Sequence, residues 1–231
     1  MIVLNDLYDY GYKIYQDNEY FKFNLDSILL AEFVKYKKND QVLDLCTGNL
    51  VIPLILHQKE KTLKIDGIEI QEKLCELGKK SIKINKISNS INIYNNNIKD
   101  INFKKKYDII TCNPPYFKNN NISKKNKEIF KTLARHEIEL DLDDIIEISS
   151  KYLKEKGNLY LIQRCERLVE VIEILNKYKL GIRKIVFIET KENKNSKIFL
   201  INAAKNKKND PKIYNIKINN NQSYKNIFKE I

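Results

Sequence analysis

The run Asn113-Pro114-Pro115-Tyr116 carries residue types that could do chemistry on a planar amine. It follows the apolar segment 107–112, "YDIITC", which predicts a strand buried on both faces. Proline donates no backbone hydrogen bond, so the strand must end here. The Asn113 side-chain oxygen can accept one amine hydrogen, and the Pro114 carbonyl, held extended by the next proline, can accept another. Tyr116 offers a ring on which a base can stack. The alternative is a proline turn that only ends a strand.

The elements around this run alternate between strands and helices. Such alternation favours a parallel sheet with right-handed crossovers, here an α/β doubly wound, mostly parallel seven-stranded sheet with an antiparallel C-terminal hairpin. The predicted strands are 41–46, 63–70, 91–94, 107–112 and 158–163, with a hairpin of 182–189 and 196–204. The predicted helices are 24–36, 51–60, 71–85, 141–157, which ends at Gly157, and 166–179.

Three parts of the chain are expected. Residues 1–38 form an N-terminal extension that packs on the cofactor site, and residues 39–204 form the α/β domain. The basic tail 205–231 contains one alternating piece, "IYNIKI", which predicts either an edge element of the sheet or partial disorder.

Ligands of open parallel sheets bind beyond the carboxyl ends of the strands, so the polar residues predicted there are candidates for a site. Glu69 ends the second strand, where a carboxylate accepts hydrogen bonds from both hydroxyls of a ribose. The alternative for Glu69 is an acid that favours a helix N-terminus. The glycine-containing turn after the first strand tips the balance towards a nucleoside-bearing cofactor. The predicted cofactor-binding residues are Asp44, Thr47, Gly48, Asn49, Glu69, Ile70, Asn97 and Asn113.

The turn lacks the G-x-G-x-x-G pattern of dinucleotide folds. Its pattern resembles the first motif of class I S-adenosylmethionine-dependent methyltransferases. The stretch "VLDLCTGNLVIPLIL" resembles "DLGTGNG…PLLL" of the bacterial methyltransferases that modify adenine N6 in valine tRNA beside the anticodon. The stretches "YQDNEYFKFNLDSILLAEF", "NPPYFK", "ARHE" and "LIQRCERLVEVIEIL" are similar to the same family, over roughly residues 7–205.

The first motif departs from that family at two positions. Cys46 and Leu50 stand where the family has glycines, and a glycine there would allow a positive φ or a close backbone approach to the cofactor. A side chain at Leu50 is expected near the methionine part of the cofactor. Asn97 stands where related enzymes often have Asp to accept from the adenine amino group, and an amide accepts without charge assistance. Weaker cofactor affinity or a shifted loop is therefore expected.

The resemblance gives the amine site a chemistry. An exocyclic adenine amine is a poor nucleophile, because its lone pair is delocalised into the ring. Accepting both of its hydrogens localises the lone pair, so Asn113, Pro114 and Tyr116 are predicted as catalytic residues. Methyl transfer from a sulfonium needs mainly alignment and desolvation, so no general base or metal is required. The predicted substrate-binding residues are Pro115, Phe117 and Arg135, of which Arg135 fits a phosphate contact or a structural salt bridge equally.

Composition limits the partners and the compartment. The net charge of +12 favours a polyanion such as RNA, although a lysine-rich bias from an AT-rich genome would produce the same charge. Four widely spaced cysteines indicate neither a zinc site nor a disulfide framework. No apolar run is long enough to span a membrane. A monomeric, cytoplasmic protein is expected.

Three functions remain open from the sequence. The first is methylation of adenine N6 in RNA, most simply a tRNA next to its anticodon. The second keeps the chemistry and changes the acceptor to DNA adenine, ribosomal RNA or a protein glutamine amide. The third, motivated by Cys46 and Leu50, is a non-catalytic RNA-binding protein with a decayed cofactor site.

Overall fold

The computed structural model describes residues 1–17, 25–114, 141–190, 193–219 and 223–231. The predicted site residues Pro115, Tyr116, Phe117 and Arg135 lie outside this part of the chain. The strands are β1 (Ile2–Asp6), β2 (Lys13–Asp17), β3 (Gln41–Leu45), β4 (Lys64–Glu69), β5 (Ile91–Asn95), β6 (Tyr107–Cys112), β7 (Leu153–Arg164), β8 (Leu180–Thr190), β9 (Asn193–Lys205) and β10 (Lys212–Ile218). The α-helices are α1 (Leu25–Phe33), α2 (Val51–Lys59), α3 (Glu72–Ile84), α5 (Leu142–Tyr152) and α6 (Leu168–Lys177), and the short 3-10 turns are η1 (Tyr8–Tyr10), η2 (Ile98–Asp100) and η4 (Cys165–Arg167).

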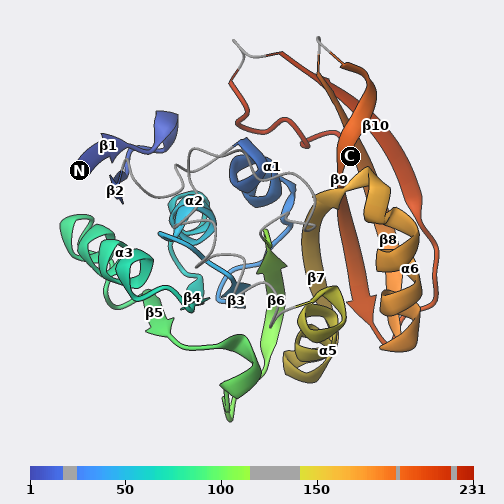
Figure 1. The fold of residues 1–231 in the computed structure, drawn as a ribbon, viewed down its shortest axis with the longest axis horizontal. Coiled ribbons are helices and arrows are strands. Elements are labelled where there is room, and N and C mark those ends of the chain that lie inside the picture. The colour runs from blue at the N-terminus through green and yellow to red at the C-terminus, as the bar shows by residue number, and fades with distance from the viewer. Residues whose placement is uncertain (18–24, 115–140, 191–192, 220–222) are drawn as a thin grey trace, which may run out of the picture.

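The main sheet has eight strands in the order β10-β8-β9-β7-β6-β3-β4-β5 (Figure 1). All neighbours are parallel except that β9 runs antiparallel to both β7 and β8. This arrangement confirms the predicted doubly wound sheet and its antiparallel hairpin. The predicted number of seven strands is one too low, because the tail supplies the edge strand β10, which pairs with β8 from Lys212 opposite Lys184 to Ile218 opposite Thr190.

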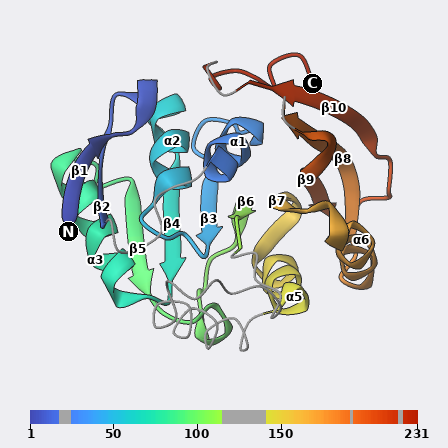
Figure 2. The same cartoon turned by 45° about the horizontal axis from the view of Figure 1, so that its top comes forward.

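Helices cover both faces of the sheet and bury two apolar clusters. One cluster joins α1, α2 and α3 to one face, and the other joins α5 and α6 to the opposite face (Figure 2). Because both faces are covered, the central strands read as apolar runs, which is why sequence alone located them. No helix in the described ranges is long and apolar enough to cross a membrane.

The predicted helix 141–157 is too long. Helix α5 ends at Tyr152, and Leu153 already has extended backbone angles. Gly157 therefore lies inside β7 and does not end a helix. A side chain there would come within 2.9 Å of the Lys154 carbonyl oxygen and 3.1 Å of the Asp108 carbonyl oxygen. The glycine serves a close backbone approach beside β6, where the β6–β7 register shifts.

Both ends of the chain pack on the domain. The antiparallel hairpin β1–β2 lies on α3, where the Tyr15 N–H donates to Ser81 Oγ at 2.9 Å. The C-terminal segment lies on α1, where the buried Phe228 ring packs edge-on against the Phe33 ring, with 5.5 Å between the ring centroids. Lys35 Nζ donates to the Phe228 carbonyl at 2.9 Å. Helix α1 is thus contacted by the C-terminal segment of the chain.

Candidate active site

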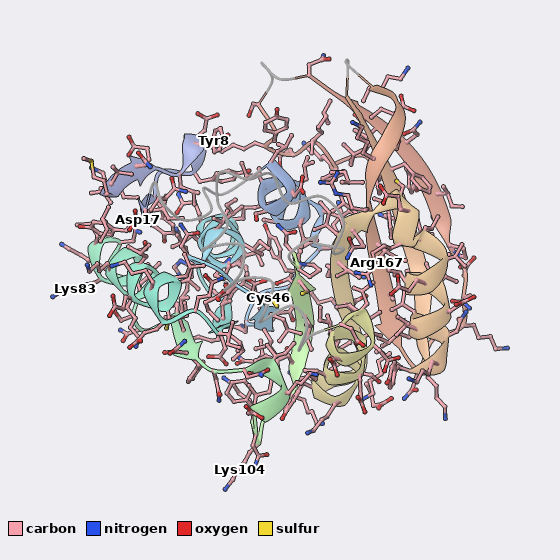
Figure 3. All side chains as sticks on the ribbon, in the orientation of Figure 1. Tyr8, Asp17, Cys46, Lys83, Lys104 and Arg167 are labelled. Atoms are coloured by element: carbon pink, nitrogen blue, oxygen red, sulfur yellow. The ribbon has the colours of Figure 1, made fainter. Side chains whose placement is uncertain are left out.

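The sheet has a switch point between β3 and β6. From β3 the chain moves outward through β4 and β5, and then returns to place β6 on the other side of β3. Leu45 pairs with Cys112, so the loop after β3 and the residues after β6 emerge side by side. Figure 3 shows Cys46 near the centre of the molecule at this edge, and Lys104 far from it on the connection that enters β6. Ligands of such sheets bind at this edge.

Asp44 joins the two sides of the switch point. Its carboxylate is fully buried and accepts from Thr47 Oγ1 and Thr111 Oγ1, each at 2.5 Å. Burial raises the pKa of Asp44 to about 7, against the lowering effect of the two hydroxyls and with a small rise from Glu69. Asp44 therefore fastens the loop to β6. Its predicted contact with a cofactor stays a prediction.

The loop 46–50 has left-handed backbone at three positions. Cys46, Gly48 and Leu50 have φ values of 55°, 59° and 75°. Left-handed backbone costs a non-glycine residue roughly 1–2 kcal/mol, and such strain collects at functional sites. Where the resembled family has glycines, Cys46 and Leu50 thus hold the conformation that glycine adopts most easily. At Gly48 a Cβ would meet no atom of the described residues within 4 Å, so none of them fills the space in front of the loop there.

Leu50 directs its side chain into the core, and the expectation that it lies near the cofactor stays a prediction. Its side chain is fully buried in the cluster of α1, α2 and α3. A Cβ at Gly67 would lie 2.9 Å from Leu50 Cδ2, and one at Gly78 would lie 3.1 Å from Cδ1. Leucine therefore fills the space that two glycines leave between β4 and α3.

Glu69 ends β4 beside this loop, as predicted. Its side chain is 5% exposed, and its two oxygens accept from the backbone N–H groups of Gly48 and Gln71, both at 2.8 Å. Burial raises the pKa of Glu69, and backbone N–H groups oppose the rise. These contacts fix the carboxylate, and a carboxylate oxygen accepts more than one hydrogen bond, so the arrangement fits a ribose.

Asn113 follows β6 and is oriented by α1. Its Nδ2 donates to Ser27 Oγ at 2.9 Å, which places the acceptor oxygen Oδ1 at the other end of the amide. Pro114 is buried next to it. Sequence reasoning missed Ser27, because 86 residues separate it from Asn113 and only the fold brings them together. The stretch "NLDS" was the available signal.

The remaining predicted residues lie around the same edge. Asn49 is buried and its Nδ2 donates to the Tyr15 carbonyl at 3.2 Å, which ties the loop to β2. The Ile70 carbonyl accepts from Asn95 Nδ2 at 3.0 Å. Asn97 Oδ1 accepts from the Lys99 N–H at 3.0 Å and so caps η2. Each of these contacts is structural, and the predicted cofactor contacts of all three residues stay predictions.

Gln163 is a further polar residue that the sequence did not indicate. It is fully buried near the end of β7, two residues past Leu161, the partner of Cys112. Its Oε1 accepts from the Arg164 N–H at 2.8 Å, and its Nε2 has no hydrogen-bond partner among the described residues. In the described ranges no group of His, Cys, Asp and Glu side chains is arranged to hold a metal.

The chain resembles known methyltransferases over most of its length. A family described as "Methyltransferase small domain" matches residues 20–178. The tRNA1(Val) (adenine(37)-N6)-methyltransferase of Trichodesmium erythraeum is 30% identical over 78% of this chain and 78% of that protein. The protein of the same name from Pedobacter heparinus is 28% identical over 75% of this chain and 73% of that protein.

A solved structure supports the fold. A predicted O-methyltransferase from Agrobacterium tumefaciens matches with a TM-score of 0.65 and 16% identity, over 86% of this chain and 90% of that one. At this low sequence identity the match supports only the architecture of the sheet and its helices.

Proposed function

This chain belongs to the methyltransferase small domain family, and we propose that it methylates the exocyclic N6 amine of an adenine in RNA. It is an S-adenosylmethionine-dependent methyltransferase, and its relatives from Trichodesmium and Pedobacter carry the name tRNA1(Val) (adenine(37)-N6)-methyltransferase. The proposed substrate is accordingly a tRNA, at an adenine next to the anticodon. The observation that carries the proposal is the Asn113 amide, fixed by Ser27 at the mouth of β6.

The residues at the switch point fit the cofactor. Glu69 presents an oriented carboxylate to a ribose, and no described residue fills the space in front of the loop at Gly48. Asp44 and Thr47 hold that loop against β6. When bound, S-adenosylmethionine supplies a methyl group activated by a positively charged sulfur.

The acceptor side of the site consists of Asn113 and Pro114. Asn113 Oδ1 and the Pro114 carbonyl accept the two hydrogens of the adenine amine, which localises its lone pair for attack. The hydrogen bond from Asn113 Nδ2 to Ser27 Oγ keeps the amide from turning its donor end towards the amine. Ser27 acts through Asn113 and is a positioning residue. Tyr116 is proposed to stack on the base, and Pro115, Phe117 and Arg135 to contact the RNA.

The partner and the setting follow from the same proposal. A net charge of +12 suits a polyanionic substrate, because each phosphate contact releases counterions. We include a cytoplasmic location and a monomeric state in the proposal, with the extension 1–38, the domain 39–204 and the tail 205–231 as its parts.

Methyl transfer to competing acceptors tests this function. The protein is incubated with labelled S-adenosylmethionine and, separately, with tRNA lacking the modification, ribosomal RNA, DNA and a glutamine-containing protein extract. Incorporation into tRNA above the other acceptors is expected, and the Asn113→Ala variant is the matched control. Label in DNA or protein alone would show that the enzyme methylates an acceptor other than RNA. Calorimetry with S-adenosylhomocysteine separates both results from a decayed site, which would show no binding.

A further inference from the structure

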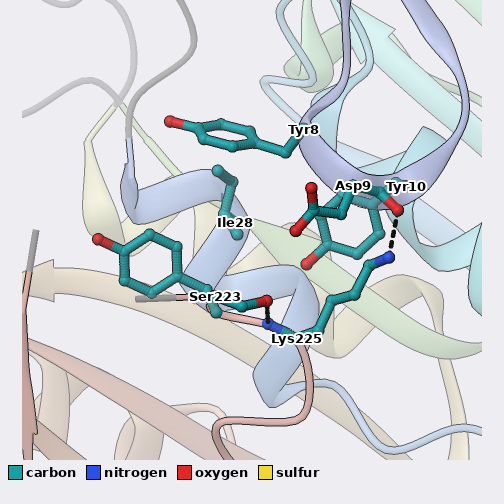
Figure 4. Close-up of a pocket in the computed structure, with 7 residues that line it drawn as sticks. Tyr8, Asp9, Tyr10, Ile28, Ser223 and Lys225 are labelled. Carbon is teal, nitrogen blue, oxygen red and sulfur yellow. Dashed lines mark hydrogen bonds between the residues drawn. The ribbon is translucent and has the colours of Figure 1, made fainter. Parts of the chain in front are cut away.

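A cavity of about 220 Å³ lies away from the switch point, between η1 and the C-terminal segment. It is much larger than the roughly 30 Å³ that one water occupies in the liquid. Tyr8 comes from η1, Ile28 from α1, and Tyr224 and Lys225 from the C-terminal segment. Figure 4 shows the Tyr8 ring across from Ile28, with Lys225 reaching the opposite wall. Two aromatic residues from the two ends of the chain thus share one cavity.

Tyr8 is displayed by a strained turn. Its φ is 43°, and its side chain is 55% exposed. A bulky residue with positive φ is uncommon and persists only where the surroundings impose it. The Leu7 N–H donates to the Tyr12 carbonyl at 2.7 Å, and the Tyr10 N–H donates to the Leu7 carbonyl at 3.0 Å. These bonds hold the turn closed with the Tyr8 ring facing outward.

Both walls of the cavity are tied to the same side chain on α1. Glu32 is buried and accepts from Tyr10 Oη at 2.7 Å and from the Asn226 N–H at 2.9 Å. Lys59 Nζ pairs with it at 2.9 Å. The two aromatic walls are therefore held in place before any ligand arrives, which lowers the entropy that binding would cost.

The cavity is aromatic, and its lining holds one cation, Lys225, and one carboxylate, Asp9. Lys225 Nζ donates to the Asp9 carbonyl and lies 5.2 Å from the centre of the Tyr10 ring. Tyr224 Oη donates to the Asn219 carbonyl at 3.2 Å, which holds that ring. Burial raises the pKa of the Tyr224 phenol, and the nearby Tyr8 adds to the rise. Stacking surfaces beside a cation are the chemistry by which proteins hold single-stranded nucleic acid.

We propose that this cavity is a second RNA-contact site, in which an unpaired base of the substrate stacks on Tyr8 and Tyr224. The inference rests on the proposed function and adds a place where the RNA is held outside the catalytic edge. Ile28, which lines the cavity, follows Ser27, which holds Asn113. One helix, α1, thus links the cavity to the amine site, and an RNA strand lying along it would meet both.

Binding of the substrate RNA without methyl donor tests the proposal. Fluorescence anisotropy compares the wild type with Tyr8→Ala, Tyr224→Ala and the double variant, and with Tyr8→Phe and Tyr224→Phe as matched controls that keep the rings. Each alanine is expected to weaken binding about 5-fold to 150-fold, the range for loss of one stacked base. The two phenylalanine variants should keep most of the wild-type affinity for RNA. The salt dependence stays unchanged, because no charge is removed. In methyl-transfer assays the alanine variants should show a higher KM for RNA and an unchanged kcat.

Three results would overturn the proposal. One is wild-type RNA affinity in the double alanine variant. Another is equal weakening by phenylalanine and alanine. The third is binding of free adenosine monophosphate that both alanines abolish while RNA affinity stays intact, which would mark a mononucleotide site. S-adenosylhomocysteine affinity and the urea midpoint of each variant confirm that it is folded. If the wild type methylates RNA and the alanine variants bind RNA as tightly as it does, this inference alone is refuted. If the wild type methylates no RNA, the proposed function is refuted.

Discussion

Leu50 provides a sharp test of the strained loop. Its left-handed backbone, with φ of 75°, is costly for any residue with a Cβ, and its side chain is fully buried against Gly67 and Gly78. Leu50→Ala removes buried atoms and keeps the strain, so it should destabilise the protein by about 2–5 kcal/mol. Leu50→Gly loses the same packing and relieves roughly 1–2 kcal/mol of strain. Glycine also destabilises the folded state by about 0.5–1 kcal/mol, because it has more backbone freedom to lose on folding.

The expected outcome is an inverted order of stability. Leu50→Gly should be more stable than Leu50→Ala by roughly 1 kcal/mol, the net of strain relief and backbone freedom. Leu54 is the matched control, since it is equally buried but lies inside α2. At this helical position Leu54→Ala should be more stable than Leu54→Gly by about 1 kcal/mol. Urea unfolding followed by circular dichroism measures all four variants, a suitable probe for a chain without tryptophan.

Two results would refute the reasoning. The same order at Leu50 as at Leu54 would show that residue 50 does not have left-handed backbone. A tenfold gain in S-adenosylhomocysteine affinity in Leu50→Gly would show that the leucine occludes the cofactor site and does not lie in the core.

Three further predictions concern the site. Asn113→Ala should leave S-adenosylhomocysteine affinity nearly intact and lower kcat by about 10²–10³, because an oriented acceptor at the amine is lost; equal losses in both quantities would contradict its role. Glu69→Ala should instead weaken cofactor affinity by roughly 1.5–3 kcal/mol for each hydrogen bond lost to the charged group, with RNA affinity held, as calorimetry and anisotropy would show. Asp44 has a folded-state pKa raised to about 7, above its ordinary value of about 3.9, so its contribution to stability is complete at low pH and is lost as pH rises from about 4 to 7. Urea midpoints across that range should fall more steeply in the wild type than in Asp44→Asn, and parallel slopes would contradict the shift.

The sequence located the parallel strands because they are buried on both faces. The strand β6 was predicted residue for residue at 107–112, and β3 and β4 to within one residue at each end. The same runs placed Asp44, Glu69 and Asn113 at one edge of the sheet. Periodicity and strand order were sufficient for this, since the carboxyl ends of parallel strands meet there.

What the sequence missed depends on contacts between distant segments. The helix α5 was extended to Gly157 because glycine commonly ends helices, whereas here it serves a close approach to Asp108. The direction of the Leu50 side chain depends on the space left by Gly67 and Gly78. The bond between Ser27 and Asn113 joins α1 to β6, and no local pattern encodes it.

The most direct test of the central claim is the position of the transferred methyl group. The protein is incubated with deuterated-methyl S-adenosylmethionine and tRNA that lacks the modification, and the tRNA is digested to nucleosides for mass spectrometry. The two acceptors at Asn113 and Pro114 predict label on N6-methyladenosine, formed about 10²–10³ times more slowly in the Asn113→Ala reaction. Label on a ring nitrogen or a ribose oxygen of the RNA, or on N6 at an undiminished rate in Asn113→Ala, would contradict the account.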